Sequence, residues 1–176
     1  MSVRLLAVSG SLRAVSTNTA LLRAAMLLKP ADMEIEFWQG LATLQHFNPD
    51  DDVEPLPPAA ADWRAKIAAA DGLLISSPEY ARGIPGSLKN ALDWLVSGPE
   101  HPGKPVAFFH ASERGVASQA ALRLVLETMG TRIVDSACIA INLLGTEKDE
   151  QTIAANPDYA AKIKSALNAF AREIAA

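Results

Sequence analysis

The sequence predicts an α/β domain in which helices cover both faces of a parallel sheet. Short apolar runs alternate with segments of helical spacing along the whole chain. The runs are almost continuously aliphatic, which is typical of parallel strands that are buried on both faces. No repeat or linker interrupts the 176 residues. We therefore expect one domain, residues 1–176, with five strands.

The strands are predicted from short apolar runs bounded by turn residues. The second run alternates with period two, which indicates a strand with one exposed face near the edge of the sheet. The fifth contains Asp135 and Ser136, where we expect the strand to divide. The five runs, in chain order, are 3–8, 33–37, 72–76, 105–110 and 132–144.

The helices are predicted from apolar residues spaced by three and four positions. The third has the clearest pattern, and two starts are open for it, one at Pro85 and one with Ser87 as the cap. Because Trp94 and Leu95 make this helix too apolar to be fully exposed, we expect an oligomer interface there, with plain core packing as the alternative. The predicted helices are 21–28, 59–70, 88–95, 117–129 and 159–174. The proline-rich residues 39–58 between the first two are expected to be irregular, with a solvated acidic cluster at 50–52.

The composition argues against several classes of protein. Lys and Arg total 16 against 20 Asp and Glu, and this net charge of −4 does not suit a nucleic-acid binder. No apolar stretch approaches the roughly 20 residues that cross a bilayer, and no cleavage site follows the N-terminal apolar run. The single cysteine, Cys138, excludes an internal disulfide and is expected to be an inert core residue. We therefore expect a cytoplasmic protein with no nucleic-acid or membrane partner.

The histidines and serines do not predict a metal site or a hydrolase. His46, His101 and His110 lie in separate segments without the spacing of metal ligands, so we expect them to be solvated or buried in the core. The Gly-x-Ser-x-Gly turn of many hydrolases is absent from the sequence. We predict no metal ligands.

A polar loop follows the first predicted strand. In an open parallel sheet, ligands bind beyond the carboxyl ends of the strands, where the strand order reverses. The loop holds Ser11, Arg13, Ser16 and Asn18 directly before a helix. Hydroxyl groups, a guanidinium and the N–H groups of a helix N-terminus are suited to a phosphate. An ordinary helix cap is the alternative interpretation, but the position after the first strand and Arg13 favour anion binding.

A stiff loop follows the third predicted strand. Residues 78–86 contain two prolines and two glycines, so the backbone is rigid and can approach a flat ligand closely. A long connection without a ligand explains this loop equally well. The loop alone does not decide between a ligand site and a structural connection.

The two loops together resemble the NADPH-dependent FMN reductase family. The resemblance lies in GSLR at 10–13 with Ser16 and Asn18, and in PEY at 78–80 followed by GIPGSLKNALDW at 83–94. Shorter similarities, GKPV at 103–106 and AALR at 120–123, extend it over roughly residues 3–145. It implies a flavodoxin-like three-layer sandwich with a five-stranded parallel sheet in the order 2-1-3-4-5. It also implies a protein that binds FMN and assembles as a homodimer or homotetramer.

The resemblance also implies an activity and a set of cofactor contacts. A hydride passes from NADPH or NADH through FMN to a small acceptor, such as a quinone, free flavin, azo compound or chromate, in a ping-pong reaction. No side chain is expected to be catalytic, because the flavin supplies the chemistry. The implied phosphate ligands are Ser11, Arg13, Ser16 and Asn18. The implied ring contacts are Pro78, Glu79, Tyr80 and Gly83 in the second loop and Ser112 after the fourth strand.

Two departures from the family pattern leave alternatives open. Ala81 and Arg82 stand where many members have an asparagine after Pro-Glu-Tyr, and residues 112–116 lack a glycine pair that is common in the third loop. These departures affect the expected substrate more than the expected flavin. A flavodoxin-type electron carrier is the main alternative function, and a member that no longer binds flavin is another. Turnover of NADPH without a protein partner separates the reductase from both.

Overall fold

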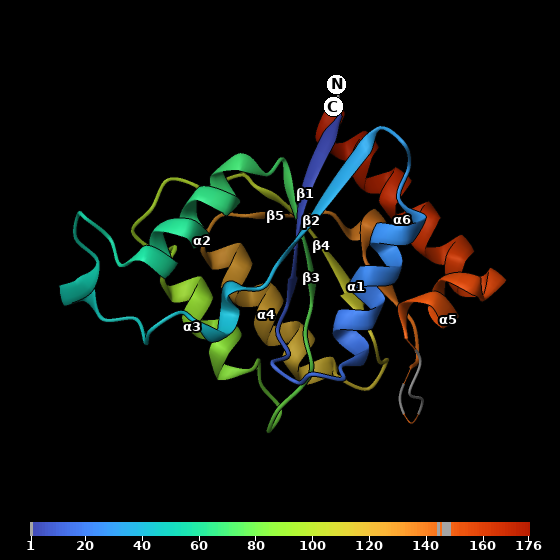
Figure 1. Cartoon of the computed structure of the whole chain (residues 1–176), viewed down its shortest axis with the longest axis horizontal. Coiled ribbons are helices and arrows are strands. Elements are labelled where there is room, and N and C mark those ends of the chain that lie inside the picture. The colour runs from blue at the N-terminus through green and yellow to red at the C-terminus, as the bar shows by residue number, and fades with distance from the viewer. Residues whose placement is uncertain (1, 144, 146–148) are drawn as a thin grey trace.

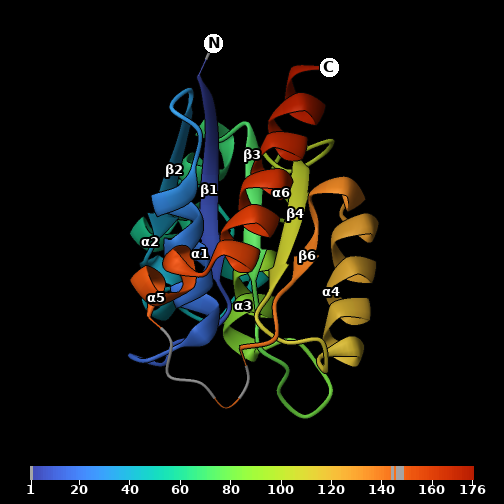
Figure 2. The same ribbon diagram turned by 90° about the vertical axis from the view of Figure 1, so that its right-hand side faces the viewer.

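The strands of the protein form one parallel sheet. A computed structural model of the chain describes residues 2–143, 145 and 149–176. The sheet (Figure 1) has the order β2-β1-β3-β4-β5, and a further short strand, β6, also pairs with β4 (Figure 2). The strands are β1 (Val3–Ser9), β2 (Met33–Trp38), β3 (Gly72–Ser76), β4 (Pro105–His110), β5 (Arg132–Ile133) and β6 (Ile139–Ala140). The predicted strand order is confirmed.

Helices cover both faces of this sheet, which gives three layers (Figures 1 and 2). The face that carries Leu5 and Leu74 packs against α1 (Thr17–Leu28), α5 (Glu150–Ala155) and α6 (Pro157–Ala175). The opposite face, with Leu6 and Ile75, packs against α2 (Pro58–Ala69), α3 (Gly86–Asp93) and α4 (Val116–Thr128). Alternate residues of each strand serve the two cores, as a sheet buried on both faces requires.

The second core contains all three tryptophans of the protein. Trp63 of α2 is 1% exposed, and its ring stacks on Trp38 with 4.2 Å between centroids. Its indole N–H donates a hydrogen bond of 2.7 Å to the carbonyl of Ala91 in α3. This buried ring therefore ties the edge strand β2 and the helices α2 and α3 together.

The structure confirms the predicted character of the second and fifth strands. The edge strand β2 alternates between buried and exposed side chains over most of its length. The fifth strand divides into β5 and β6 around the single turn η3 (Asp135–Ala137), and both pieces pair with β4. The last residue of the predicted run, Leu144, lies outside the described residues. Helix α3 starts directly after Pro85, so Ser87 is not its cap.

The interface prediction for Trp94 and Leu95 is wrong. They are 0% and 1% exposed in the single chain, so a partner cannot contact them. The cover comes from the segment 39–58, which contains the short turns η1 (Gly40–Ala42) and η2 (Pro49–Asp51). The Trp94 indole N–H donates to the Gln45 carbonyl at 2.9 Å, and Phe47 packs edge-on against its ring.

The acidic cluster 50–52 is only partly solvated, contrary to expectation. Asp50 and Asp51 are exposed. The Asp52 side chain is 8% exposed and forms an ion pair of 2.9 Å with Arg64. This pair attaches the irregular segment to α2.

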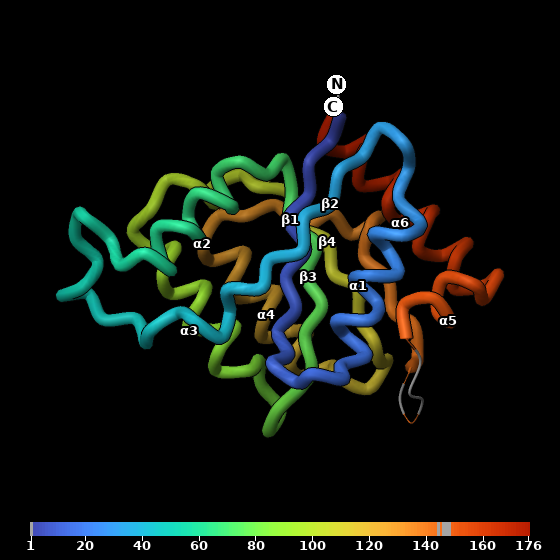
Figure 3. The backbone as a smooth tube through the Cα atoms, in the orientation of Figure 1, coloured from blue at the N-terminus to red at the C-terminus, as the bar shows by residue number. Residues whose placement is uncertain are grey.

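The loops that follow β1, β3 and β4 gather at one end of the sheet. Figure 3 shows them at the end away from both chain termini. Within the part of the chain that the structure describes, no helix has the length and apolarity of a membrane span.

Candidate functional site

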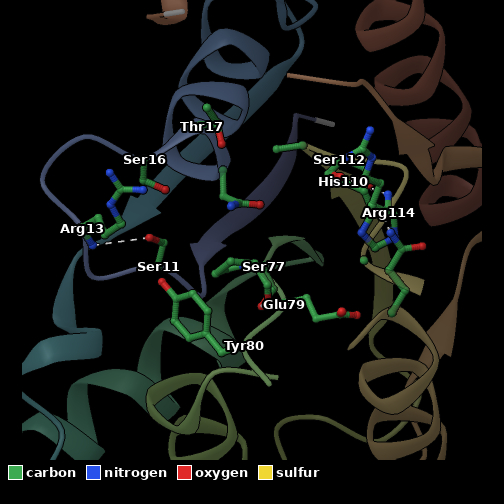
Figure 4. Close-up of a pocket in the computed structure, with 15 residues that line it drawn as sticks. Ser11, Arg13, Ser16, Thr17, Ser77, Glu79, Tyr80, His110, Ser112 and Arg114 are labelled. Atoms are coloured by element: carbon green, nitrogen blue, oxygen red, sulfur yellow. Dashed lines mark hydrogen bonds between the residues drawn. The ribbon is translucent and has the colours of Figure 1, made fainter. Parts of the chain in front are cut away.

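A pocket of about 330 Å³ opens where β1, β3 and β4 end (Figure 4). Three loops supply its walls, each directly after one of these strands. Its lining residues are Ser11, Arg13, Ser16, Thr17, Asn18, Ser77, Pro78, Glu79, Tyr80, His110, Ala111, Ser112, Arg114, Gly115 and Gln119. Eight of the nine predicted cofactor residues are among them, so the topology brings the predicted site together.

The first loop runs close against the start of the second. The Gly10 N–H donates to the Ser76 carbonyl at 2.8 Å, which extends the contact between β1 and β3 beyond the strands. A Cβ atom on Gly10 would lie 2.6 Å from the Ser77 hydroxyl oxygen. A side chain at position 10 would therefore have to displace the side chain of Ser77, and the glycine leaves room for it.

Helix α1 begins at the pocket with a polar N-terminus. Ser16 is its cap, and the Ser16 hydroxyl accepts a long hydrogen bond of 3.4 Å from the Thr19 N–H. The first N–H groups of a helix have no acceptor inside the helix, and together with the helix dipole they favour an anion. Arg13, in the exposed part of the loop, lies next to Ser11 and Ser16 at the same end of the pocket (Figure 4).

Asn18 has a positioning contact that the sequence did not reveal. Its amide oxygen accepts a buried hydrogen bond of 2.9 Å from the Ser76 hydroxyl at the end of β3. The amide therefore fixes the start of α1 to β3, and its NH₂ group can donate to a ligand.

The second loop contains a tight two-residue turn. Tyr80 and Gly83 exchange backbone hydrogen bonds of 3.0 and 2.9 Å. Between them, Ala81 and Arg82 have φ angles of 50° and 60°. This left-handed pair is usual for a turn of this kind but costs roughly 1–2 kcal/mol per non-glycine residue. Gly83, predicted as a ring contact, does not line the pocket and instead closes the turn that presents Tyr80.

The third loop and α4 form the opposite wall. Gly115 precedes α4 and has no side chain to cap it. The Glu79 carboxylate of the second loop takes that role, because it accepts a 2.9 Å hydrogen bond from the Ser118 N–H. The Ser112 hydroxyl accepts from the Arg114 N–H at 3.0 Å, and the Gln119 amide donates to the Ser112 carbonyl at 3.3 Å.

His110, at the carboxyl end of β4, is a pocket residue that the sequence analysis assigned no role. Burial, with a smaller contribution from the positive charge of Arg123, lowers the pKa of His110 from 6.5 to about 4. The imidazole is therefore neutral at physiological pH. The rule that ligands meet strand ends would have found it, since the fourth strand was predicted to end at this residue.

Neither the cysteine nor the acidic residues form a second reactive centre in the described part of the chain. The half-buried Cys138 thiol accepts a hydrogen bond from the Phe108 N–H, and burial raises its pKa. An unreactive thiol is expected from such surroundings. No group of His, Cys, Asp and Glu among the described residues could hold a metal ion.

Comparison with known proteins places the chain among flavin-dependent reductases. An NAD(P)H-dependent FMN reductase of Pseudomonas aeruginosa is 42% identical over 112 residues, which are 62% of this chain and 60% of that protein. A quinone reductase of Escherichia coli is 34% identical over 150 residues, 81% of this chain and 79% of the relative. A 2-hydroxy-1,4-benzoquinone reductase of a Burkholderia species is 43% identical over 94 residues, 53% of this chain and 50% of the relative.

The solved structures agree in fold. A flavoenzyme NAD(P)H:(acceptor) oxidoreductase from Paracoccus denitrificans superposes with a TM-score of 0.66 at 24% identity, covering 97% of this chain and 90% of the other. The sequence profile of the NADPH-dependent FMN reductases matches residues 3–144. The chain therefore belongs to the NADPH-dependent FMN reductase family.

Proposed function

We propose that the protein binds FMN in the pocket and transfers electrons from NADPH or NADH to a quinone. The observation that carries the proposal is the convergence of the three loops on one pocket. Its polar end has hydroxyls, a guanidinium and a helix N-terminus, and its other walls come from the second and third loops. These are the groups that a phosphate and a planar ring need at opposite ends of one site.

The first loop would hold the phosphate of FMN. Ser11 and Ser16 offer hydroxyl donors, and Arg13 offers a positive charge with a planar set of N–H groups. The Asn18 oxygen accepts the hydrogen bond from Ser76, and the NH₂ group of the same amide would donate to the phosphate. The hydrogen bond from the Gly10 N–H to the Ser76 carbonyl holds the start of this loop against the end of β3.

The second and third loops would border the ring. When bound, FMN supplies the two-electron chemistry of the reaction. Pro78, Glu79 and Ser112 line the pocket, and so does Tyr80, which is 49% exposed. Since the pocket is open to solvent on one side, nicotinamide and acceptor can enter it in turn, as the expected ping-pong order requires.

We assign no acid–base residue to the reaction. The carboxylate of Glu79 is engaged at the N-terminus of α4, and His110 stays neutral because of its low pKa. The residues of the pocket would bind and orient the reactants, while solvent reaches the open mouth and supplies protons.

A homodimer or homotetramer in the cytoplasm completes the proposal. Apolar side chains that are more than half exposed, Leu12, Val15 and Val116, lie in or beside the pocket loops and offer a surface for a second copy. A single cysteine is compatible with a reducing compartment.

Steady-state kinetics test the proposal against the electron carrier and against a member without flavin. The FMN-loaded protein is mixed with NADPH and 2-methyl-1,4-naphthoquinone, with no other protein present. We expect turnover and parallel lines in double-reciprocal plots. FMN retained without turnover would indicate a carrier, and loss of FMN on gel filtration would indicate a member that does not bind flavin.

A further inference from the structure

A second arginine, Arg114, lies across the pocket from the phosphate loop. Figure 4 shows Arg13 at one side of the pocket and Arg114 at the other, beside His110 and Ser112. The phosphate of the proposed FMN accounts for Arg13. It does not account for Arg114, which belongs to the third loop, where the chain departs from the family pattern.

The backbone of Arg114 is held in place while its charge stays available. The backbone N–H of Arg114 donates to the Ser112 hydroxyl at 3.0 Å, and the Gln119 amide donates to the Ser112 carbonyl from α4. The side chain is exposed, and among the described residues no carboxylate forms an ion pair with it. An unpaired guanidinium in a pocket wall is a site for an anion.

The other ionisable groups at this end do not replace it. The Glu79 carboxylate accepts its hydrogen bond from the Ser118 N–H, and among the described residues it forms no ion pair with Arg114. His110 is neutral at physiological pH, since its pKa lies near 4. Arg123 is paired with Asp135 and Glu127. Among the described residues that line the pocket, Arg114 is therefore the positive charge on the side opposite Arg13.

We infer that Arg114 selects acceptors that carry a negative charge beside their reducible carbonyls, with ionised 2-hydroxyquinones as the substrate class. The inference rests on the proposed function and names the acceptor of the same site. The 2′-phosphate of NADPH is a poorer candidate, because it lies at the opposite end of the dinucleotide from the nicotinamide that must reach the ring.

The chemistry of a 2-hydroxyquinone suits this arrangement. Its hydroxyl is conjugated with a carbonyl, as in a carboxylic acid, and is ionised at neutral pH. In the reaction, NAD(P)H, one proton and the quinone anion give NAD(P)⁺ and the hydroquinone anion, with two electrons transferred. That product then takes up a proton, because its hydroxyl is now an ordinary phenol with a pKa of about 10. Arg114 consequently favours the charged substrate over the neutral product, which aids release.

Two quinones of similar size provide the test in the FMN-loaded protein. 2-Hydroxy-1,4-naphthoquinone is an anion at pH 7, and 2-methyl-1,4-naphthoquinone is neutral. We expect Arg114→Gln to lower kcat/KM for the anion about tenfold, which is the effect of losing an exposed hydrogen bond to a charged group. The kcat/KM for the neutral quinone should stay within twofold of the wild-type value. Arg114→Lys should recover part of the loss, and Arg172→Gln on the exposed face of α6 should change neither quinone.

A binding measurement without turnover gives a second readout. Calorimetric titration of the oxidised protein with the hydroxyquinone should show about tenfold weaker binding in Arg114→Gln, with the difference shrinking at high salt. Equal losses for both quinones, or an unchanged dissociation constant, would overturn the inference. An effect of Arg114→Gln confined to a higher KM for NADPH, with the KM for NADH unchanged, would also overturn it. If the wild-type protein reduces neither quinone, the proposed function fails instead.

Discussion

The contact between Glu79 and Ser118 predicts a measurable share of the stability of the pocket wall. Helix α4 has a glycine at its N-cap position and no cap from its own sequence. The Glu79 carboxylate, 2.9 Å from the Ser118 nitrogen, serves as a cap from a distant loop. Loss of a cap costs about 1 kcal/mol, and loss of a negative charge at a helix N-terminus costs about 0.3–1 kcal/mol.

We therefore expect Glu79→Ala to lower the free energy of unfolding by about 1–2 kcal/mol, or the Tm by about 2–8 °C. Glu79→Gln should lose less, because its amide oxygen still accepts the hydrogen bond but carries no charge. Urea unfolding of the FMN-free protein, followed by circular dichroism, measures both. Glu113→Gln is the matched control, since it removes a nearby exposed carboxylate that makes no such bond. A Glu79→Ala variant as stable as this control would refute the capping role.

Two further predictions concern the opposite ends of the pocket. Arg13→Ala should weaken FMN binding about 10- to 150-fold, the effect of losing a hydrogen bond to a charged group, without changing the stability in urea. Fluorescence titration with FMN measures the affinity, and an unchanged affinity would remove Arg13 from the site. The folded-state pKa of His110, about 4, lies below its ordinary 6.5, so the unfolded chain binds the proton first. His110 therefore costs no stability above pH 6.5 but increasingly destabilises the fold as the pH falls toward 4. His110→Gln should flatten that decline in urea unfolding measured across this range, and parallel curves would contradict the shift.

The order of elements and the location of the site could be predicted because they depend on local patterns. Aliphatic runs and helical spacing gave the parallel sheet, and the strand order followed from the family resemblance. The position after a strand brought Ser11 and Ser112 to one pocket. Parallel strands present their carboxyl ends at one edge, so residues far apart in sequence meet there without any pairwise signal.

Contacts between distant segments could not be predicted in the same way. Trp94 is covered by the irregular segment 39–58, whose proline-rich sequence has no periodicity that would indicate a packed face. Glu79 caps a helix 39 residues further along the chain, and Asn18 binds a strand 58 residues away. Each pair depends on tertiary geometry, and either partner alone has the ordinary composition of a turn or a cap.

The most direct test of the proposed function is an anaerobic titration. The purified protein is loaded with FMN, freed of excess cofactor and mixed with NADPH while the flavin absorbance is followed. We predict rapid bleaching with one equivalent of NADPH and recovery of the yellow colour on addition of a quinone. Flavin that stays bound and oxidised in the presence of both NADPH and NADH would contradict a reductase function.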